Sequence, residues 1–372
     1  MRIFLVGGGT GGHFYPLIAV AEALRTREQE SGGVIELYYI GPNPYNQAAL
    51  TAHNISFVSC PAGKRRRYAS ILNFLDTFKV LAGVMVAFCK LWYYYPDVIM
   101  SKGGYTSVPV VIAAGLLRIP VVAHDSDAVP GKATLIAKRI ARYIGVSYQE
   151  ALQYFPEEKV ALTGIPIRKA FFTPAADPRG TLGITDALPI VFVTGGSLGA
   201  ERINTVVLDS LDELLPAYVV VHQAGAEHAE NVIRTAQSLI TDQTLLGRYY
   251  VLPHLTEEQM VAAEQAADII VSRAGSTTIA EIALNGKPSI IVPIPEEISH
   301  DQRKNAYAYA KTGAATVIEE KNLADGILSA EINRILTDQT VRQGMITAAQ
   351  GFTAGNAAYT LADTLRGIAN EH

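Results

Sequence analysis

Short apolar runs alternate with helix-length segments along the whole chain, and this alternation limits the possible folds more than any other feature. In the first half the runs are separated by segments long enough for crossover helices. The strands expected there are residues 2–6, 34–40, 55–58, 97–100, 119–123, 143–146 and 159–162. Strands alternating with helices in this way build a parallel sheet with helices on both faces.

The alternation pauses at residues 171–189, whose proline, glycine and aspartate content is typical of a linker. A second series follows, with strands expected at 189–193, 218–221, 249–252, 268–271, 288–292 and 315–318. Each series opens with a strand, a glycine-rich turn and a helix. The pattern predicts an α/β protein of two doubly wound domains facing each other across a cleft, with ligands at the carboxyl ends of the strands.

We place the first domain at residues 1–170 and the second at 171–355. A last helix candidate, 357–369, lies in the remaining segment 356–372 and could pack back on the first domain. The opening run MRIFLV is too short for a signal peptide. The longest stretch without charge, between Lys102 and Arg118, contains glycines and a proline, so we do not expect it to span a membrane.

Composition excludes several classes of protein. The 372 residues include 31 basic and 35 acidic side chains, which argues against a nucleic-acid binder relying on overall positive charge. Two cysteines, Cys60 and Cys89, fit no metal or redox spacing, so a reducing compartment is expected. Residues 1–165 carry 16 basic and 11 acidic residues, against 15 and 24 in the remainder. Either the first half meets an anionic partner or the asymmetry is an accident of composition.

The first glycine turn, Gly7–Gly12, contains the spacing G-x-G-x-x-G. The second expected strand ends at residues 40–42 without the acidic residue that a dinucleotide ribose needs, and a P-loop lysine is absent. Free N–H groups before a helix expected to start near Phe14 favour a phosphate or diphosphate. The alternative is a tight turn that binds nothing. His13, at the mouth of the turn, could be a general base or a phosphate donor.

The second glycine turn, Thr194–Ala200, also follows a strand and opens a helix. It predicts a second anion site, with Ser197 adding a hydroxyl, or again a plain turn. Two further first-half segments, 101–105 and 124–127, follow strands directly, where ligand loops belong. His124, Asp125 and Asp127 indicate acid–base chemistry or a metal site, unless they only form turns and caps. Arg168 is placed to clamp a phosphate between the domains.

In the second half, Gly275 precedes a helix that we expect Ser276 to cap. Glu281 lies off the apolar stripe of this helix, where it could accept both ribose hydroxyls or simply be a solvated surface residue. The segment 300–306 opens another helix with acid and amide groups suited to sugar hydroxyls, although an exposed polar helix start would look the same.

A basic cluster, residues 64–67, precedes a helix candidate at about 70–95. The apolar residues of this helix recur at helical spacing, and they form a wider apolar face than packing against one core requires. They are Ile71, Phe74, Phe78, Leu81, Met85, Phe88 and Trp92, widened by Leu72, Leu75, Val84 and Val86. Such a helix beside basic residues is typical of a membrane-surface site, or else of an ordinary core helix behind a solvated turn.

Taken in order, the motifs GGTGGH, GGY, H-acid, G-x-P-x-R, GGS-x-GA, R-x-G-x-x-T-x-x-E-I and D-Q-x-x-N-A resemble the MurG family over nearly the whole chain. These are peripheral membrane glycosyltransferases of bacterial cell-wall synthesis. The resemblance implies the GT-B fold and inverting transfer of N-acetylglucosamine from UDP-GlcNAc to the muramoyl 4-hydroxyl of lipid I. It also implies attachment to the cytoplasmic face of the cell membrane through the anionic lipid surface.

The resemblance further implies site residues. Catalytic candidates are His13, His124 and Asp125. Contacts to the polyprenyl-diphosphate-linked acceptor would come from Gly8, Gly9, Thr10, Gly11, Gly12, His13, Gly104, Tyr105 and Asp127. Contacts to UDP-GlcNAc would come from Thr10, Gly11, Gly12, Asp127, Arg168, Gly196, Ser197, Leu198, Leu255, Gly275, Ser276, Thr277, Glu281, Asp301, Gln302 and Asn305.

Of the candidate bases, we favour the His124–Asp125 pair for proton transfer and assign His13 to phosphate. No cofactor is expected. We also expect no metal, because two helix-terminus phosphate sites and Arg168 can neutralise the leaving UDP. The chain departs from the usual family pattern at Asp125, Asp127, Leu198 and the order His300-Asp301. These departures touch the acceptor and sugar contacts.

Three other functions compete. A GT-B enzyme with a different lipid acceptor, or a UDP-GlcNAc epimerase, would share the fold, but a soluble substrate needs no membrane face. A dinucleotide oxidoreductase would need the missing acid after the second strand. A non-catalytic nucleotide-sugar-binding protein would not need His13, Asp125 or Arg168.

Overall fold

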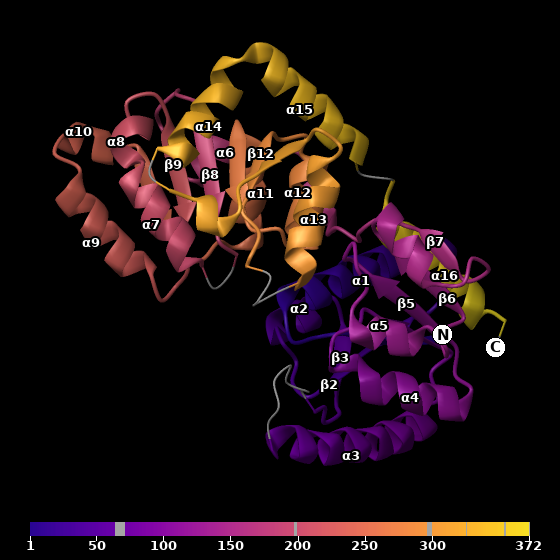
Figure 1. Cartoon of the computed structure of the whole chain (residues 1–372). Helices are drawn as coiled ribbons and strands as arrows, with labels where there is room; N and C mark the ends of the chain where they lie inside the picture. The colour runs from indigo at the N-terminus through magenta and orange to yellow at the C-terminus, as the bar shows by residue number, and fades with distance from the viewer. Residues whose placement is uncertain (64–70, 197–198, 296–299, 325, 353–354, 372) are drawn as a thin grey trace. The chain divides into compact units, whose positions relative to one another are not determined.

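The computed structural model describes residues 1–63, 71–196, 199–295, 300–324, 326–352 and 355–371, with the backbone alone at 71–78 and 300–301. The chain divides into two compact units. The first comprises Met1–Lys169 and Ala354–His372, and the second comprises Ala170–Thr353 (Figure 1). Each unit is built around its own sheet.

The first unit contains a parallel sheet of seven described strands in the order β3-β2-β1-β4-β5-β6-β7. Its strands are β1 Arg2–Val6, β2 Glu36–Gly41, β3 Ile55–Ser59, β4 Val98–Ser101, β5 Val121–Asp125, β6 Tyr143–Val146 and β7 Val160–Leu162. Its helices are α1 Gly11–Ser31, α2 Gln47–Ala52, α3 Ile71–Tyr94, α4 Ser107–Leu117, α5 Lys132–Ala137, the 3₁₀ helix Gln149–Tyr154 and the C-terminal α16 Ala357–Ala369. The strand order changes direction between β1 and β4. This is a topological switch point, where ligands bind in such sheets.

The second unit repeats this arrangement with six described strands in the order β10-β9-β8-β11-β12-β13. The strands are β8 Ile190–Thr194, β9 Val219–Gln223, β10 Tyr249–Leu252, β11 Ile269–Ser272, β12 Ser289–Ile291 and β13 Ala315–Val317. The helices are α6 Pro178–Thr181, α7 Glu201–Asp209, α8 Leu211–Leu214, α9 Ala229–Leu239, α10 Gln243–Leu246, α11 Glu257–Ala266, α12 Ser276–Leu284, α13 His300–Ala310, α14 Ile327–Thr337 and α15 Gln339–Phe352, with 3₁₀ turns at Lys169–Phe172 and Glu320–Asn322. Its switch point lies between β8 and β11.

Every strand predicted from the sequence is present in the described part of the chain, with its bounds shifted by at most two residues. The apolar runs are nearly continuous because both faces of each sheet are buried. In β1, Ile3 and Leu5 pack on the α1 side, while Phe4 and Val6 pack on the α3 and α4 side. The prediction of two doubly wound α/β domains is therefore confirmed.

The C-terminal helix α16 packs against α1 within the first unit (Figure 1). Leu361, Leu365 and Ile368 enter the same core cluster as the α1 side chains. Arg27 on α1 also donates two hydrogen bonds to the Asp363 carboxylate, both of 2.8 Å. Helix α16 thus joins α1 in covering one face of the sheet of the first unit.

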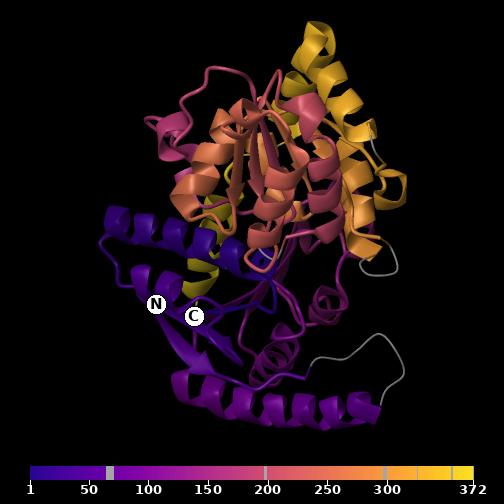
Figure 2. The ribbon, with the colours of Figure 1, turned by 90° about the vertical axis from the view of Figure 1, so that its left-hand side faces the viewer.

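Helix α3 lies on the opposite face of that sheet from α1 (Figure 2). It packs on α4 through Gly83, Ala87 and Leu91. A Cβ atom added to Gly83 would come within 2.4 Å of the Pro61 carbonyl oxygen, so the helix approaches the backbone closely there. Because Gly83 and Ala87 are small, α3 packs closely through one narrow stripe of its surface. Its opposite side faces outward.

Candidate active site

The first glycine turn leads from β1 directly into α1. The helix starts at Gly11, with Thr10 as its N-cap residue, and not near Phe14 as the sequence suggested. Glycine is a poor helix former, which misled the prediction, but the first turn needs few intrahelical bonds. The amide groups of Gly11 and Gly12 therefore belong to the positive end of a 21-residue helix. This is a suitable place for a phosphate group.

Aromatic rings explain why the turn requires glycine. A Cβ atom on Gly8 would lie 2.6 Å from the Tyr39 hydroxyl, and one on Gly9 would lie 2.8 Å from Cε1 of Tyr105. Gly9 also has φ of +95°, a conformation that favours glycine. The Tyr39 hydroxyl donates a 2.8 Å hydrogen bond to the Gly7 carbonyl, which fixes the start of the turn.

The turn after β4 meets the glycine turn. Gly104 has φ of +75°, and a Cβ atom there would lie 2.7 Å from the Gly8 carbonyl oxygen and 3.5 Å from Cδ2 of His13. Tyr105 follows at once and packs beside Gly9. The structure thus brings together the acceptor candidates Gly8, Gly9, His13, Gly104 and Tyr105, which come from two separate stretches of sequence.

His13 is partly buried, and its Nδ1 lies 2.8 Å from the Thr10 hydroxyl. Burial, followed by the positive charge of Lys102, lowers its pKa to about 4, while Asp127 acts in the opposite direction. His13 is therefore neutral near pH 7. A diphosphate bound at the turn would favour the protonated ring and raise this pKa.

His124 and Asp125 end β5 but do not interact with each other through a hydrogen bond. Neighbouring residues on a strand point to opposite faces. Nε2 of His124 lies 2.9 Å from the Gly164 carbonyl oxygen, and its ring is fully buried beside Gly145. Burial, followed by the Lys102 charge, holds the pKa of His124 well below its usual value. In this arrangement Asp125 does not orient the His124 ring through a hydrogen bond.

The Asp125 carboxylate is 5% exposed and accepts hydrogen bonds from two backbone amides, those of Asp127 at 3.0 Å and Gly131 at 3.1 Å. Burial and then the neighbouring Asp127 raise its pKa, whereas Lys102, the Thr134 hydroxyl and the backbone lower it. Its position at the carboxyl end of β5 and its raised pKa are both features of a proton acceptor.

Arg168 lies at the end of the first unit, with its guanidinium 4.6 Å from the centre of the Tyr15 ring. Tyr15 belongs to the second turn of α1. A Cβ atom on Gly11 would lie 3.3 Å from the Tyr15 ring, so Tyr15 connects the arginine to the first turn of α1. The guanidinium is thus held near the same helix end as the glycine turn.

The second glycine turn follows β8. Ser197 and Leu198 lie outside the described residues, but the glycines on either side have φ of +86° at Gly196 and +76° at Gly199. A Cβ atom on Gly199 would lie 2.1 Å from the Ala224 carbonyl oxygen. The turn therefore closes tightly against the segment after β9 before α7 begins at Glu201.

A polar pair that the sequence analysis did not single out supports this turn. The Thr194 hydroxyl donates a 2.6 Å hydrogen bond to Oε1 of Gln223 and accepts a 3.1 Å bond from the Gly196 amide. Both side chains are buried at the ends of adjacent strands. The sequence does hold a signal for this pair, because a polar residue stands at the end of each of two successive apolar runs.

Helix α12 follows the β11 strand at the same edge. Its N-cap residue is Gly275 and not Ser276 as expected, so Ser276 is the first helical residue. The buried Thr277 hydroxyl has no hydrogen-bond partner among the described residues. Glu281 is 7% exposed, which excludes a solvated surface position. Leu255 is buried just before α11, whose N-cap is Thr256.

Helix α13 brings two amides to this edge of the second sheet. Nδ2 of the buried Asn305 donates to the Ala274 carbonyl at 3.4 Å, and Oε1 of Gln302 accepts from the Ile294 amide at 3.4 Å. The side chain of Asp301 lies outside the described residues. Asn305 thus connects α13 to the turn that starts α12.

The described residues contain no cluster of three potential metal ligands. They also contain no helix long and apolar enough to cross a bilayer. The basic cluster at 64–67 lies outside the described part of the chain. In α3, three apolar side chains of the predicted stripe point outward, with Leu81 58%, Met85 65% and Trp92 66% exposed. Among the described side chains of the stripe, these three form an exposed face, whereas Val86 and Phe88 pack against the core.

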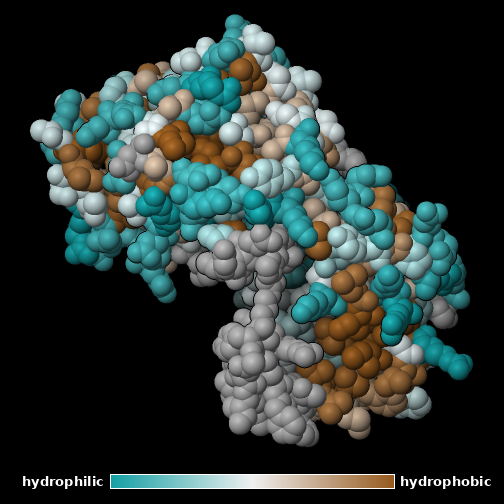
Figure 3. Space-filling view, viewed as in Figure 1, coloured by the Kyte–Doolittle hydropathy of each residue, from teal (hydrophilic) through white to brown (hydrophobic). Residues whose placement is uncertain are grey.

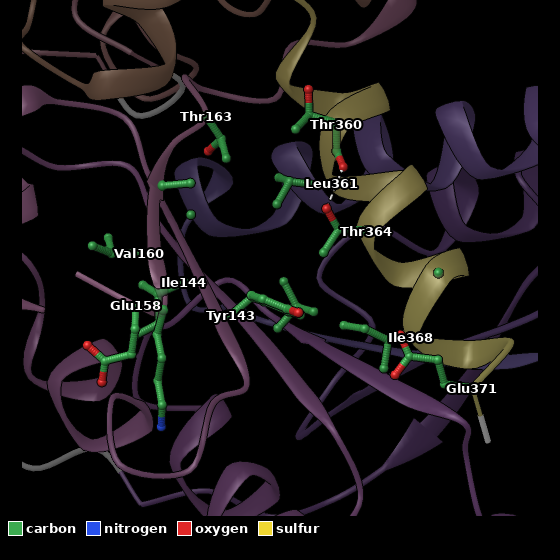
Figure 4. Close-up of a pocket in the computed structure, with 15 residues that line it drawn as sticks. Tyr143, Ile144, Glu158, Val160, Thr163, Thr360, Leu361, Thr364, Ile368 and Glu371 are labelled. Carbon is green, nitrogen blue, oxygen red and sulfur yellow. Dashed lines mark hydrogen bonds between the residues drawn. The ribbon is translucent and has the colours of Figure 1, made fainter. Parts of the chain in front are cut away.

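One pocket of about 470 Å³ lies apart from these turns, between α16 and the strands β6 and β7 (Figure 4). Tyr143, Val160 and Thr163 line it from the sheet side, and Leu361 and Ile368 line it from α16. None of the predicted site residues belongs to it. We therefore place the candidate active site at the glycine turns and not in this pocket.

The comparisons with known proteins cover both units. The model of the glycosyltransferase family 28 N-terminal domain matches residues 3–146, and that of the C-terminal domain matches residues 190–365. A relative from Treponema denticola is 34% identical over 98% of this chain and 97% of its own length, and one from Clostridium perfringens is 34% identical over 98% of each. Both are named UDP-N-acetylglucosamine–N-acetylmuramyl-(pentapeptide) pyrophosphoryl-undecaprenol N-acetylglucosamine transferase.

Solved structures show the same fold. The crystal structure of Acinetobacter baumannii MurG superposes with a TM-score of 0.74 at 24% identity, covering 98% of this chain and 99% of the other. A UDP-GlcNAc 2-epimerase from Neisseria meningitidis, bound to UDP-GlcNAc, gives a TM-score of 0.68 at 13% identity over 99% of this chain and 100% of the other. At these identities the likeness concerns the fold alone.

Two Rossmann-like units, each with a glycine turn at its switch point, form the GT-B fold, and the family 28 domains together with the transferase relatives identify a hexosyltransferase. The chain belongs to the MurG family within glycosyltransferase family 28. The resemblance seen in the sequence motifs is thereby confirmed, and the oxidoreductase alternative finds no support among these relatives.

Proposed function

We propose that the chain transfers N-acetylglucosamine from UDP-GlcNAc to the muramoyl 4-hydroxyl of a polyprenyl-diphosphate-linked muramoyl-peptide. The observation that carries this proposal is the identity of about 34% with transferases of that name over 98% of the chain. The alternative of an epimerase has only the shared fold in its favour. The activity belongs to bacterial cell-wall synthesis.

The donor is assigned to the second unit. Gly196, Gly199 and the α7 N-terminus suit the UDP phosphates, because a helix N-terminus presents free amide groups and the positive end of its dipole. Glu281, a buried carboxylate on α12, suits the two ribose hydroxyls, and the backbone at Leu255 suits uracil. Gln302 and Asn305 suit the sugar hydroxyls, since amides can both donate and accept hydrogen bonds.

The acceptor is assigned to the first unit. The Gly8–Gly12 turn takes its diphosphate at the α1 N-terminus, and neutral His13 donates a hydrogen bond there. Asp125 takes the proton of the attacking hydroxyl. The α7 N-terminus supplies positive charge for the leaving UDP, and Arg168 is a further candidate phosphate contact, so the proposed reaction has no step that requires a metal.

Attachment to the cytoplasmic face of the membrane is assigned to α3. Figure 3 shows an apolar surface on the part of the first unit where α3, α4 and α5 pack together. Exposed apolar side chains there include Met85 and Trp92 of α3, Leu116 of α4, and Leu135 and Ile136 of α5. An exposed apolar face of this kind suits a lipid surface, and the basic residues 64–67 would add attraction to anionic headgroups.

The transferase activity is tested by incubating the chain with UDP-GlcNAc and a lipid I analogue and measuring UDP release. Release that needs both substrates supports the proposal. UDP-GlcNAc alone is the control, and its conversion to an epimer without UDP release would show the alternative enzyme. The Glu281→Ala variant should need a higher UDP-GlcNAc concentration for the same rate, because the carboxylate that accepts the ribose hydroxyls is removed.

The membrane assignment can be tested with Cys89, which is exposed on the outward side of α3, whereas Cys60 is buried and its thiol pKa is raised to about 11. A maleimide dye sensitive to polarity will therefore label Cys89 selectively. Its emission should shift to the blue with anionic vesicles and less so in high salt. An unchanged emission with every vesicle composition would contradict the assignment.

A further inference from the structure

Lys102 is a buried charged residue for which neither the donor nor the acceptor assignment has a use. It follows β4 directly, and its amide donates a 2.8 Å hydrogen bond to the Val6 carbonyl at the end of β1. The residue is only 3% exposed. A Cβ atom on Gly7 would lie 2.7 Å from the lysine Cβ, so the side chain passes directly beside the start of the glycine turn.

The Lys102 ammonium is buried near the carboxylates of Asp125 and Asp127. A buried ammonium costs several kcal/mol, so a protein keeps one only where nearby opposite charge offsets the cost. Asp125 and Asp127 supply that charge from β5 and the loop after it, and both favour the charged lysine. Burial acts against them and lowers the pKa of Lys102.

β4 pairs with β5 through Ser101 and Ala123, so Lys102 follows β4 beside the strand end that carries His124 and Asp125. Two residues further on, a Cβ atom on Gly104 would lie 3.5 Å from the His13 ring. The Lys102 charge disfavours protonation of both histidine rings and favours ionisation of Asp125. One buried cation therefore acts on the charge state of the three catalytic candidates. Without it, burial and Asp127 would together favour the protonated, inactive form of Asp125.

We propose that Lys102 is a positioning residue of the transfer reaction, a fixed buried cation that keeps Asp125 ionised and His13 neutral. This assignment rests on the proposed function. In the reaction, the acceptor 4-hydroxyl oxygen forms a bond to the anomeric carbon as the bond from that carbon to the UDP oxygen breaks. UDP leaves with the electron pair, and the hydroxyl proton passes to the Asp125 carboxylate.

The test compares Lys102→Met, which keeps the length of the side chain without its charge, with Lys102→Arg, which keeps the charge. Lys287→Met is the matched control, because Lys287 is also a largely buried lysine but belongs to the second unit, where its ammonium donates to the Gln265 and Ala267 carbonyls. For each protein, kcat is measured from about pH 5 to 9, and the histidine ring signals are titrated by NMR, with His13→Ala identifying the His13 signal.

In Lys102→Met the acidic limb of the kcat profile should move up by about one pH unit, because Asp125 protonates more easily. The His13 pKa should rise in the same variant. Lys102→Arg and Lys287→Met should keep the wild-type limb. A loss of kcat that is equal at every pH, with an unmoved His13 signal, would show a merely structural role and overturn the proposal.

The two proposals fail in different ways. A wild-type chain without transfer at any pH would refute the proposed function and with it the role of Asp125 as base. The NMR titration does not depend on turnover. An unchanged His13 pKa in Lys102→Met would refute the charge assignment of Lys102 even where the transferase is fully active.

Discussion

We propose Asp125 as the proton acceptor, because its carboxylate is buried at a strand end and accepts hydrogen bonds from two backbone amides. Asp125→Asn removes the base while keeping the size of the side chain. We expect kcat to fall by about 10²–10⁴-fold with little change in the donor KM. Steady-state kinetics with both substrates varied will measure this.

The control for that substitution is His13→Ala, which should mainly raise the acceptor KM because we propose that His13 binds the diphosphate. The reverse result, with kcat lost at His13 and the acceptor KM raised at Asp125, would exchange the two roles. Thermal melts of both variants check that the first unit still folds.

His222 gives the second unit a pH-dependent stability. Its ring is fully buried between the Tyr249 hydroxyl at 2.7 Å and Oδ1 of Asn204 at 3.0 Å, and burial lowers its pKa from 6.5 to about 3. Below about pH 6.5 His222 therefore binds a proton in the unfolded chain, whereas in the folded chain it stays neutral down to about pH 3. Stability falls as the pH drops through this range, by about 2 kcal/mol at pH 5.

His222→Gln removes the ionisation, so the decline in unfolding free energy between pH 7 and 5 should be smaller by about that amount. Urea unfolding at the two pH values gives the comparison. An identical decline in the variant and the wild type would mean that His222 is not the group responsible.

Residue types and spacing predicted which side chains end at the switch points but not how they interact. The expected His124–Asp125 pair does not form a hydrogen bond, because adjacent strand residues face opposite ways and the Gly164 carbonyl takes the imidazole. Glu281 looked as much like a surface residue as a ligand. Its burial depends on neighbours distant in sequence, which a single sequence does not reveal.

At the scale of elements, the second glycine turn depends on close backbone contact. Gly199→Ala would place its Cβ 2.1 Å from the Ala224 carbonyl oxygen, so the turn must open. UDP affinity by calorimetry should fall at least tenfold, the loss expected from about one charge-assisted hydrogen bond.

The matched control is Gly326→Ala, which has a similar φ of +74° but no atom within 4 Å of its Cβ. That variant should lose only about 1–2 kcal/mol of stability from backbone strain and bind UDP normally. Equal loss of UDP affinity in both variants would show that general destabilisation, and not the turn, is responsible.

Helix α3 supplies the second prediction at this scale. Replacing Leu81, Met85 and Trp92 together with glutamine should abolish most vesicle binding, because each contributes about 1–3 kcal/mol when buried in lipid. All three are more than half exposed, so the fold should survive. Leu239→Gln on α9, an exposed leucine of the second unit, is the control. Unchanged co-sedimentation of the triple variant would exclude α3 as the membrane face.

The sequence predicted these elements well where apolar periodicity is strong, and less well where glycine interrupts it. All strands appeared within two residues of their expected bounds because they are buried on both faces. The start of α1 was wrong because glycine propensity argues against a helix at Gly11 and Gly12. The apolar stripe of α3 was identified, but only the packing through Gly83, Ala87 and Leu91 shows that Leu81, Met85 and Trp92 point outward.

At the scale of the whole molecule, the assignment gives the acceptor to the first unit and most donor contacts to the second. The donor candidates Ser197, Leu255, Glu281 and Gln302 all belong to Ala170–Thr353. Glu281→Ala in the full chain should weaken UDP-GlcNAc binding by about 1–3 kcal/mol without changing the acceptor KM. Calorimetry gives the first value and kinetics the second. Unchanged UDP-GlcNAc affinity would remove Glu281 from the ribose role.

The most direct test of the transferase assignment is the stoichiometry and structure of the product. The chain is mixed with UDP-GlcNAc and a lipid I analogue, UDP is quantified, and the lipid product is examined by mass spectrometry and NMR. We predict one disaccharide per UDP released, with the new glycosidic bond in the β configuration. UDP released without disaccharide, or an epimerised nucleotide sugar with no UDP released, would contradict the account.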